Sequence, residues 1–357
     1  MKKKILLVMS TVAALSLAAC SNTTNQGTTQ KQEASAQTQQ QKSEAPAAFY
    51  YTANEGGSIS KIDATTNKVV ETIQVEGAVH NVQVSPDGKV IAATVVPNME
   101  SGDHDSMEMN GLVSFYDTSS NKLLKTVEVG EHPAHVVFTQ DGKYVLVTNN
   151  EGNDVSILDG KTYEAIKNVA VGNGPHGFRI SNDSRFAYIA NMGADSVSVV
   201  DLQELKEIKK ITVGQVPVTT GVTSDGKTLL VTLNAENAVA IVDLATEQVE
   251  KVPVGKGPAQ VYIQSDDKYA FVANQGTEDE PSNSISKIDL STKKVIATIE
   301  TGKGAHGIVT SADNQFVYVT NMFENTVSVI DNEKNQVIKT IPVEEKPNGI
   351  TFQKGIK

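Results

Sequence analysis

The sequence contains no tryptophan, a single cysteine (Cys20) and only 5% aromatic residues. One cysteine excludes a disulfide within the chain, and it also excludes a zinc site built from several thiolates. Basic residues are too few to balance the acidic ones, so the formal net charge is −11, and no basic run occurs after the first few residues. Because a strongly acidic surface repels phosphate backbones, we expect no nucleic-acid partner.

A long hydrophobic run is also missing, and the N-terminus instead has the pattern of a secretory signal. The apolar stretch from Ile5 to Ala14 is shorter than the roughly 20 residues that a membrane-spanning helix needs. It ends in Leu17-Ala-Ala-Cys20, which resembles the bacterial lipobox. The resemblance implies that residues 1–19 are a signal peptide, and that Cys20 becomes the lipid-carrying (palmitate-bearing) first residue of a lipoprotein.

Residues 20–47 are rich in Gln, Thr, Ser and Ala and have almost no large apolar side chains. Such a composition cannot form a core, so we expect a disordered tether. Several acyl chains on Cys20 would anchor it stably, because each buried methylene contributes about 0.8 kcal/mol. We therefore expect the protein on the outer face of the bacterial cell membrane, or on the periplasmic side of an envelope membrane in a Gram-negative cell.

What the rest of the chain does contain is a repeat. Seven aspartates, each closing a short alternating segment, are separated by 54, 42, 42, 42, 46 and 42 residues; they are Asp63, Asp117, Asp159, Asp201, Asp243, Asp289 and Asp331. A period of about 40–45 residues made of short strands is typical of a β-propeller. Because one repeat cannot bury both of its faces, the repeats must stack in a ring. The sequence predicts an all-β, seven-bladed β-propeller over residues 48–357.

The repeat carries a recognisable sequence. Tyr318-Val-Thr-Asn321 resembles the YVTN β-propeller repeat family, and variants of it stand at 51–54, 146–149, 188–191, 231–234 and 271–274. The resemblance implies the fold, but this family is functionally diverse and implies little about activity. The propeller is also similar to those of nitrous oxide reductase and cytochrome cd1, which hold copper or haem over the channel with rim histidines. The sequence lacks their further ligands, such as a Cys-x-x-Cys-His haem site.

The phase of the repeat predicts how the ring closes. The last segment, Asn348–Gln353, matches the part of the other repeats that leads into the next Tyr-Val-Thr-Asn strand. We expect it to supply the innermost strand of the first blade. The repeated Asp and Asn residues are interpreted as turn and cap residues that bond their own downstream backbone, since they recur in almost every repeat.

Histidines carry the strongest functional signal. Four of the six precede a predicted innermost strand, within segments rich in Gly or Pro: His80, His135, His176 and His306. The other repeats place Thr219, Ala259 and Asn348 at this position. Because all innermost strands start at one mouth of the channel, the histidines should form an arc on a common rim. The alternative is inherited repeat chemistry, in which each imidazole bonds only backbone groups.

Methionines form a second signal. An insertion in the second repeat holds Met99, His104, Met107 and Met109 among acidic residues, and Met192 and Met322 occupy the matching loops of other repeats. Methionine is normally a core residue. Imidazole with thioether suits copper, and imidazole with carboxylate suits zinc. Alternatively, the insertion is a solvated loop or a protein-docking loop.

These observations favour a lipid-anchored, extracytoplasmic binding protein over an enzyme, and we assign no catalytic residue. A copper or zinc ion is the candidate ligand, with His80, His135, His176, His306, His104, Met99, Met107 and Met109 as candidate ligands to it. One alternative is an interaction module for an envelope protein or a surface polymer, without metal. The other is a small-molecule lyase or hydrolase with an active site on the rim. No hydrolase, metalloprotease or phosphate-loop motif supports this last reading.

Overall fold

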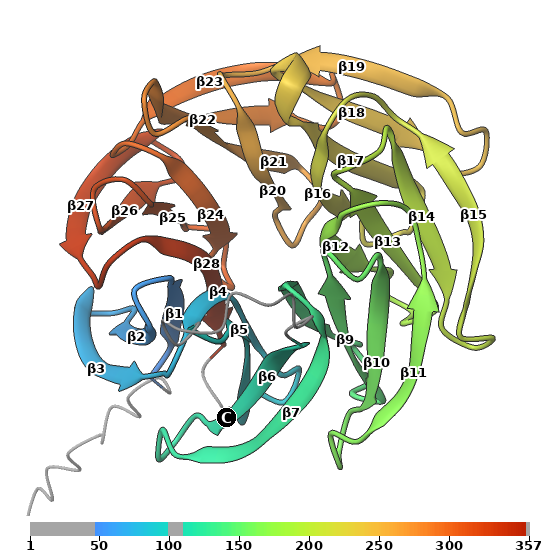
Figure 1. Cartoon of the computed structure of the whole chain (residues 1–357). Helices are drawn as coiled ribbons and strands as arrows, with labels where there is room; N and C mark the ends of the chain where they lie inside the picture. The colour runs from blue at the N-terminus through green and yellow to red at the C-terminus, as the bar shows by residue number, and fades with distance from the viewer. Residues whose placement is uncertain (1–46, 99–109, 355–357) are drawn as a thin grey trace, which may run out of the picture. The chain divides into compact units, whose positions relative to one another are not determined.

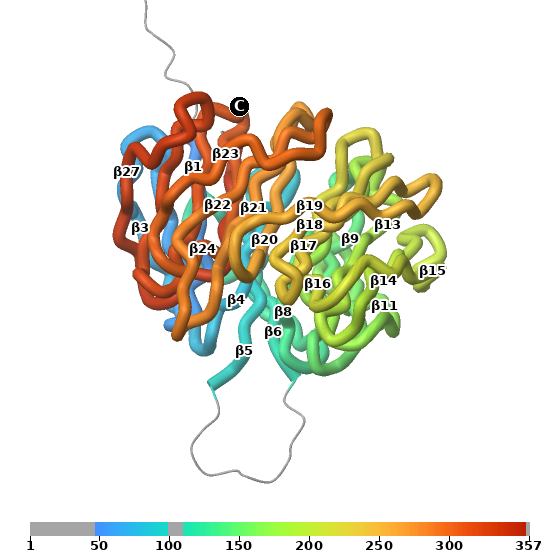
Figure 2. Tube along the Cα trace, turned by 90° about the horizontal axis from the view of Figure 1, so that it is seen from above, coloured from blue at the N-terminus to red at the C-terminus, as the bar shows by residue number. Residues whose placement is uncertain are grey.

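The structure is a computed structural model that describes residues 47–98 and 110–354. These residues form seven four-stranded antiparallel sheets, arranged radially around a central channel (Figures 1 and 2). The predicted seven-bladed β-propeller is therefore confirmed. The signal peptide 1–19, Cys20, all but the end of the tether, and Met99, His104, Met107 and Met109 lie outside the described residues.

Each blade is listed from the channel outward. Blade 1 contains β28 (Pro347–Gln353), β1 (Phe49–Asn54), β2 (Ser58–Asp63) and β3 (Lys68–Gln74). Blade 2 contains β4 (Ala78–Val84), β5 (Val90–Val96), β6 (Asn110–Asp117) and β7 (Leu123–Glu131). Blade 3 contains β8 (Pro133–Phe138), β9 (Tyr144–Asn149), β10 (Asp154–Asp159) and β11 (Ala165–Ala170).

The remaining blades follow the same order. Blade 4 contains β12 (Pro175–Ile180), β13 (Phe186–Asn191), β14 (Ser196–Asp201) and β15 (Lys206–Thr212). Blade 5 contains β16 (Pro217–Val222), β17 (Thr228–Leu233), β18 (Ala238–Asp243) and β19 (Val249–Pro253). Blade 6 contains β20 (Pro258–Ile263), β21 (Tyr269–Gly276), β22 (Pro281–Asp289) and β23 (Lys294–Glu300). Blade 7 contains β24 (Ala305–Thr310), β25 (Phe316–Asn321), β26 (Thr326–Asp331) and β27 (Gln336–Pro342).

In the described part of the chain, the only helical element is the short 3-10 helix η1 (Asn234–Glu236). No helix in these residues is long and apolar enough to cross a membrane.

The ring closes as predicted. β28 pairs antiparallel with β1, so Phe49 lies opposite Gln353 and Tyr51 lies opposite Thr351. The Tyr51 hydroxyl donates to Gln353 Oε1 at 2.8 Å, which joins residues 302 positions apart. The first blade therefore combines both ends of the propeller sequence.

Hydrophobic side chains are buried between neighbouring blades. Val137 and Leu146 of blade 3, for example, lie in one cluster with Phe178 and Ile189 of blade 4. The second strand of each blade is covered on both faces, which explains why β13 reads as an almost continuous apolar run. The outermost strands are mostly exposed, and β15 buries one residue near its end, Ile211.

The seven periodic aspartates close turns, as predicted. Asp63 Oδ1 accepts the backbone N–H groups of Thr65 and Thr66 at 3.0 and 2.6 Å. Asp201 accepts from Gln203 and Glu204 in the same way. These bonds fix the turn between the third and fourth strands of each blade, so the aspartates have a structural explanation.

The repeated asparagines differ from the expectation. Asn191 Nδ2 donates to the hydroxyls of Ser196 and Ser198 on the next strand, at 3.1 and 2.9 Å, and not to its own downstream backbone. In blade 5 the equivalent residue is Leu233, which pairs with Ala238, and not Asn234, which begins η1. In blade 5 the serines of the neighbouring strand are replaced by Ala238 and Ala240, because a buried hydroxyl without a partner is costly. In blade 2, where Val95 takes the Asn position, Ser114 bonds Thr126 instead.

Candidate functional site

Strand register defines which side chains reach the rim of the channel. In each blade, one residue of the inner strand pairs with the Asn position of the second strand, as Pro175 pairs with Asn191 and Val79 pairs with Val95. We call the next residue of the inner strand, such as His176 after Pro175, the rim position. Around the ring it is occupied by Asn348, His80, Ala134, His176, Val218, Ala259 and His306.

His135 and Thr219 therefore do not stand at the rim position, contrary to the sequence alignment. Each lies one residue further along its strand, after Ala134 and Val218. The inner strands share the same register irregularity, so the residue directly after the proline marks the rim position: His176 follows Pro175 directly, whereas His135 stands two residues after Pro133. His135 still reaches the same group of histidines, from blade 3, which stands between blades 2 and 4.

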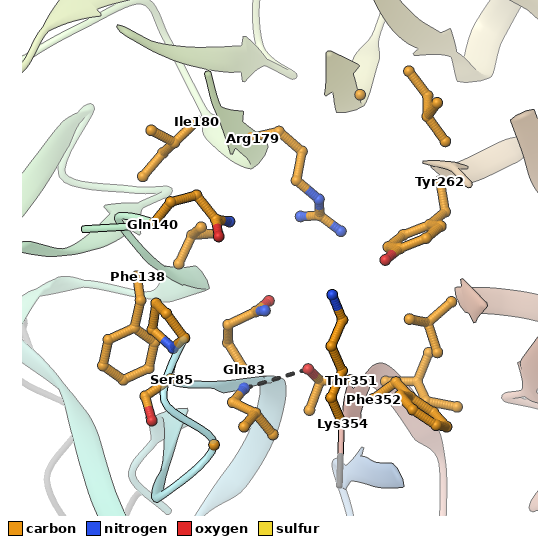
Figure 3. Close-up of a pocket in the computed structure, with 18 of the residues that line it drawn as sticks. Gln83, Ser85, Phe138, Gln140, Arg179, Ile180, Tyr262, Thr351, Phe352 and Lys354 are labelled. Atoms are coloured by element: carbon orange, nitrogen blue, oxygen red, sulfur yellow. Dashed lines mark hydrogen bonds between the residues drawn. The ribbon is translucent and has the colours of Figure 1, made fainter. Parts of the chain in front are cut away.

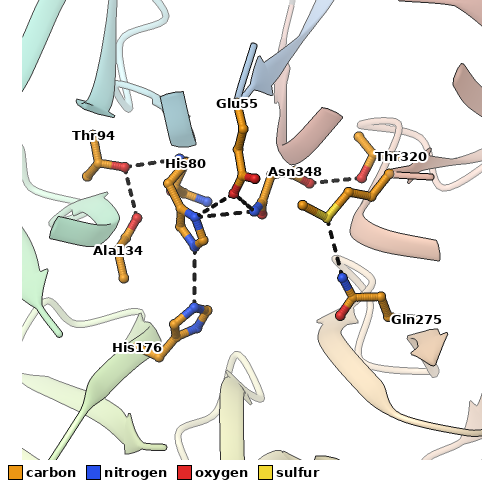
Figure 4. A network of polar contacts seen from close by, with 10 residues as sticks. Glu55, His80, Thr94, Ala134, His176, Gln275, Thr320 and Asn348 are labelled. Atoms are coloured by element: carbon orange, nitrogen blue, oxygen red, sulfur yellow. Dashed lines mark hydrogen bonds and ion pairs between the residues drawn. The ribbon is translucent and has the colours of Figure 1, made fainter. Parts of the chain in front are cut away.

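Threonines of the repeat hold the rim backbone in place across blade boundaries. The Thr148 hydroxyl, from the Tyr-Val-Thr-Asn segment of blade 3, accepts the N–H of His135 at 3.0 Å and donates to the carbonyl of His176 at 2.7 Å. Thr94 bonds Asn81 and Ala134 in the same way (Figure 4). Each threonine thus ties the rim of one blade to the next, so the imidazoles start from a rigid backbone.

Three of the four predicted histidines come together. One ring nitrogen from each of His80, His135 and His176 lies within 4.8 Å of the others. The ring centroids are 5.0 to 6.0 Å apart. Nε2 of His80 is 3.3 Å from Nε2 of His176 (Figure 4). We call these three residues the histidine cluster.

The two facing nitrogens both carry lone pairs if each ring is protonated on its other nitrogen. His80 Nδ1 lies 3.0 Å from Glu55 Oε1, a carboxylate that can only accept. His176 Nδ1 lies 3.3 Å from the carbonyl oxygen of Val218, which also can only accept. His80 Nδ1 also lies 3.2 Å from Asn348 Nδ2, but that amide donates to Glu55 Oε1 at the shorter distance of 2.7 Å. Both Nδ1 atoms therefore donate, and in the neutral rings both Nε2 atoms point their lone pairs at the same space. A positive charge between them would relieve this repulsion.

His135 has no hydrogen-bond partner for either ring nitrogen among the described residues, although it is only 1% exposed. Burial, with the neighbouring His176 and His80, lowers the pKa of His135 well below its usual range. Burial, with the neighbouring His80 and His306, lowers the pKa of His176 to about 3. His135 and His176 are therefore neutral near pH 7, and neutral imidazole is the form that binds metals.

Glu55 is a member of the site that the sequence did not reveal. Its Oε1 accepts from His80 Nδ1 and, at 2.7 Å, from Asn348 Nδ2. Burial alone would raise the pKa of Glu55, but the hydrogen bonds and the positive potential of His80 outweigh it and lower that pKa to about 2. Glu55 directly follows Asn54, as Met192 follows Asn191. Comparing that position across repeats would have shown a lone carboxylate.

His306 occupies the rim position of blade 7 but is not part of the histidine cluster. It is 5% exposed, and its Nδ1 has no hydrogen-bond partner in the described part of the chain. Burial and the nearby His80 lower the pKa of His306 to about 4, although Glu55 opposes this shift. His306 therefore shares the electrostatic environment of the cluster, and it is the one member of the predicted set that stands apart.

The two described methionines, Met192 and Met322, follow the second strands of blades 4 and 7, on loops equivalent to the one that carries Glu55 in blade 1, and they lie outside the cluster. Met192 is exposed. Met322 Sδ accepts a hydrogen bond from Gln275 Nε2 at 3.3 Å. Met99, His104, Met107 and Met109 lie outside the described residues, so their part in a metal site stays a prediction.

Two family models match parts of the chain. The YNCE-like beta-propeller model matches residues 99–268, and the Cytochrome D1 heme domain model matches residues 229–351. The predicted resemblance to repeat propellers and to cytochrome cd1 is thereby confirmed. A search of curated proteins finds no match.

Solved structures of similar fold come from proteins of different activities. They include hydrazine synthase of Kuenenia stuttgartiensis, with a TM-score of 0.67 and 21% identity over 76% of this chain and 89% of that one. Dihydro-heme d1 dehydrogenase NirN in complex with DHE gives 0.63 and 16% over 86% and 75%. A putative 6-phosphogluconolactonase from Bacteroides fragilis NCTC 9343 gives 0.67 and 15% over 87% and 99%. At these identities the similarity shows the fold alone.

The residues do not fit a haem. His306 is the only histidine within the segment matched by the heme-domain model, and it is too deeply buried to present its ring to a macrocycle. The histidine cluster lies in other blades, and its facing nitrogens at 3.3 Å leave no slot for a porphyrin plane with an axial imidazole on each side, which would separate them by about 4 Å. A single ion suits this geometry better.

Proposed function

We propose that the protein binds one transition-metal ion, copper or zinc, at the channel rim through His80, His135 and His176. The observation that carries the proposal is the 3.3 Å separation of two Nε2 atoms whose rings both donate through Nδ1. A tetrahedral ion with metal–nitrogen bonds of about 2.0–2.1 Å separates two ligand nitrogens by about 3.3–3.4 Å. The apo geometry of this pair thus already matches a bound state.

His135 would complete the set. Its two ring nitrogens are buried without partners in the described structure, and buried polar groups are normally satisfied. Inherited repeat chemistry, with each imidazole bonding backbone, explains His176 but not His135. Glu55 would orient His80 and make it a better ligand, as carboxylates beside metal-bound histidines do.

Three imidazoles leave a fourth coordination position open, which suits an ion that is exchanged or sensed. Neutral imidazole is compatible with both zinc and copper, and a methionine sulfur from the loop at 99–109 would shift the preference to copper. We further propose that a lipid on Cys20 holds this site at the outer face of the membrane. Mass spectrometry of the mature N-terminus tests that part separately, because an unmodified Cys20 would contradict it without affecting the metal site.

The decisive experiment is metal analysis of the protein purified without chelator and without a histidine tag, followed by titration of the apo protein with zinc and with copper(I). We expect a stoichiometry near one and a rise in melting temperature on binding. His176→Ala should abolish both effects. His132→Gln is the matched control. His132 is an exposed histidine that faces Glu151 and lies outside the histidine cluster, so its replacement should leave both effects intact. Metal-free protein that neither ion stabilises would contradict the proposal and favour an interaction module.

A further inference from the structure

The opposite mouth of the channel contains a second site. A cavity of about 520 Å³ lies between the far ends of the inner strands. One structurally equivalent position in all seven blades lines it, and the residues there are Gln83, Val137, Arg179, Gly221, Tyr262, Val309 and Thr351. Arg179 is three residues beyond His176, so the two sites are about 10 Å apart along β12.

Arg179 is the only charged residue in this ring of seven. Its side chain points into the cavity together with the hydroxyl of Tyr262 (Figure 3). Within the described residues its one hydrogen bond is from Nη1 to the carbonyl of Phe178, at 2.9 Å, and no described carboxylate forms an ion pair with it. A guanidinium in this position retains several donors that have no acceptor in the described chain.

A second cation faces the same space. Lys354, just after β28, extends its ammonium group toward the Arg179 guanidinium (Figure 3). The one acidic residue lining the cavity, Asp87, is occupied elsewhere, because its Oδ1 accepts from the Ser85 hydroxyl at 2.7 Å and the Lys89 backbone at 3.1 Å. Two like charges thus converge with no counter-ion among residues 47–98 and 110–354, in a chain whose formal net charge is −11.

The choice of arginine is itself informative. Only two of the 31 basic residues in the sequence are arginines, Arg179 and Arg185. Arg185 lies on the surface near Asp201, whereas Arg179 lies in the channel. The planar guanidinium binds carboxylate or phosphate oxygens in a bidentate manner, which lysine cannot do.

We infer that this cavity binds a small organic oxyanion, a carboxylate or phosphate, through Arg179 and Lys354. Gln83 and the Tyr262 hydroxyl supply further polar contacts, and Phe138 and Phe352 offer an apolar wall. The volume lies in the range of ordinary small-molecule sites, about 300–1,000 Å³. The site is independent of the histidine cluster.

Titration calorimetry of the full chain, in chelator and at constant ionic strength, tests the inference. The probes are benzoate for a carboxylate, phenyl phosphate for a phosphate, and inorganic phosphate. We expect saturable binding of at least one probe below about 10 mM, weakened about tenfold or more by Arg179→Gln and retained in the Arg185→Gln control. Glutamine already occupies the equivalent position at Gln83, so the fold should tolerate this variant. Absence of saturable binding, or a smaller effect of Arg179→Gln, would overturn the inference.

Discussion

Nε2 of His80 lies 3.3 Å from Nε2 of His176, although the two residues are 96 positions apart in the sequence and belong to blades that do not touch through a shared sheet. Blade 3 stands between them, and it contributes His135 to the same group. The propeller thus brings three imidazoles together through ring geometry alone. Five predictions follow from the contacts around this group and from the ring that holds it.

The carboxylate of Glu55 should tune metal binding without touching the metal. Glu55→Gln removes the charge that His80 Nδ1 faces at 3.0 Å, so we expect zinc or copper affinity to fall by about 10-fold or more. Competition titration with a chromophoric chelator measures it. Glu151→Gln is the control, since Glu151 faces the exposed His132 at 3.5 Å and should leave affinity unchanged. Equal affinities for both variants and the parent would remove Glu55 from the site.

His135 should lower the stability of the metal-free protein and be required for metal binding. Both of its buried ring nitrogens lack partners within the described residues, and such groups cost about 1–3 kcal/mol each. His135→Leu keeps a similar volume and removes them, so the metal-free protein should unfold at a higher denaturant concentration while metal binding is lost. Denaturation in chelator and metal titration provide the two readouts. A less stable variant would indicate that the imidazole is satisfied in the apo protein.

Acid should destabilise the metal-free protein. In the folded state the pKa is about 3 for His176 and about 4 for His306, whereas an unfolded histidine titrates near 6.5. Between about pH 6.5 and pH 4 the unfolded chain therefore binds more protons than the native one, and the free energy of unfolding falls as the pH falls.

His306→Asn isolates one of these groups. Asparagine already stands at the equivalent rim position in blade 1, as Asn348, so the variant should fold. We expect its free energy of unfolding to depend less steeply on pH than that of the parent over the same window. Urea titrations in chelator at several pH values compare the slopes, and parallel slopes would contradict the lowered pKa of His306.

In blade 4 the side-chain amide of Asn191 bonds the hydroxyls of Ser196 and Ser198, and we call these three residues the clamp. The effects of substitutions in the clamp on the free energy of unfolding should be non-additive. Asn191→Leu leaves the hydroxyls of Ser196 and Ser198 without their donor, and we expect the free energy of unfolding to drop by about 1–3 kcal/mol. Adding Ser196→Ala and Ser198→Ala recreates the Leu233, Ala238 and Ala240 set of blade 5. That triple variant should recover part of the loss, whereas a further loss with each substitution would show that the three residues act separately.

Ring closure should control cooperativity. Deleting residues 348–357 removes most of β28, and with it the inner strand of blade 1 and the bond between Tyr51 and Gln353. We expect a broad, multistep unfolding transition in place of one sharp transition. Calorimetry and circular dichroism measured on the same samples would show it. A truncated protein that melts sharply near the parent temperature would mean that six blades and an open seventh suffice.

The regular part of this structure could be predicted because a propeller repeats one local solution seven times. The period of the aspartates gives the number of blades, and the phase of Asn348–Gln353 gives the closure. Errors arose where one repeat departs from the others by a single residue. In blade 3 the histidine stands two residues after Pro133, one place later than His176 stands after Pro175, so His135 lies off the rim position. In blade 5 Leu233 takes the Asn position, and Asn234 begins η1 instead.

The polar partners were harder to predict, because they depend on contacts between blades. Glu55 matters only through His80 and Asn348, and the latter is 293 residues away. Arg179 lies within a strand whose pattern is otherwise that of buried sheet, so nothing local distinguishes it. The three-histidine geometry likewise required the ring, since spacing along the chain does not determine which imidazoles converge.

The pairing of β28 with β1 also has a consequence for synthesis. A ribosome releases β1 long before β28 exists, so the nascent chain carries one unpaired strand edge through almost the whole of translation. Blade 1 can therefore be completed only after the residues of β28 have been synthesised. A copy clipped near residue 347 would offer that edge to the tail of another molecule, which is a direct route to an exchanged dimer.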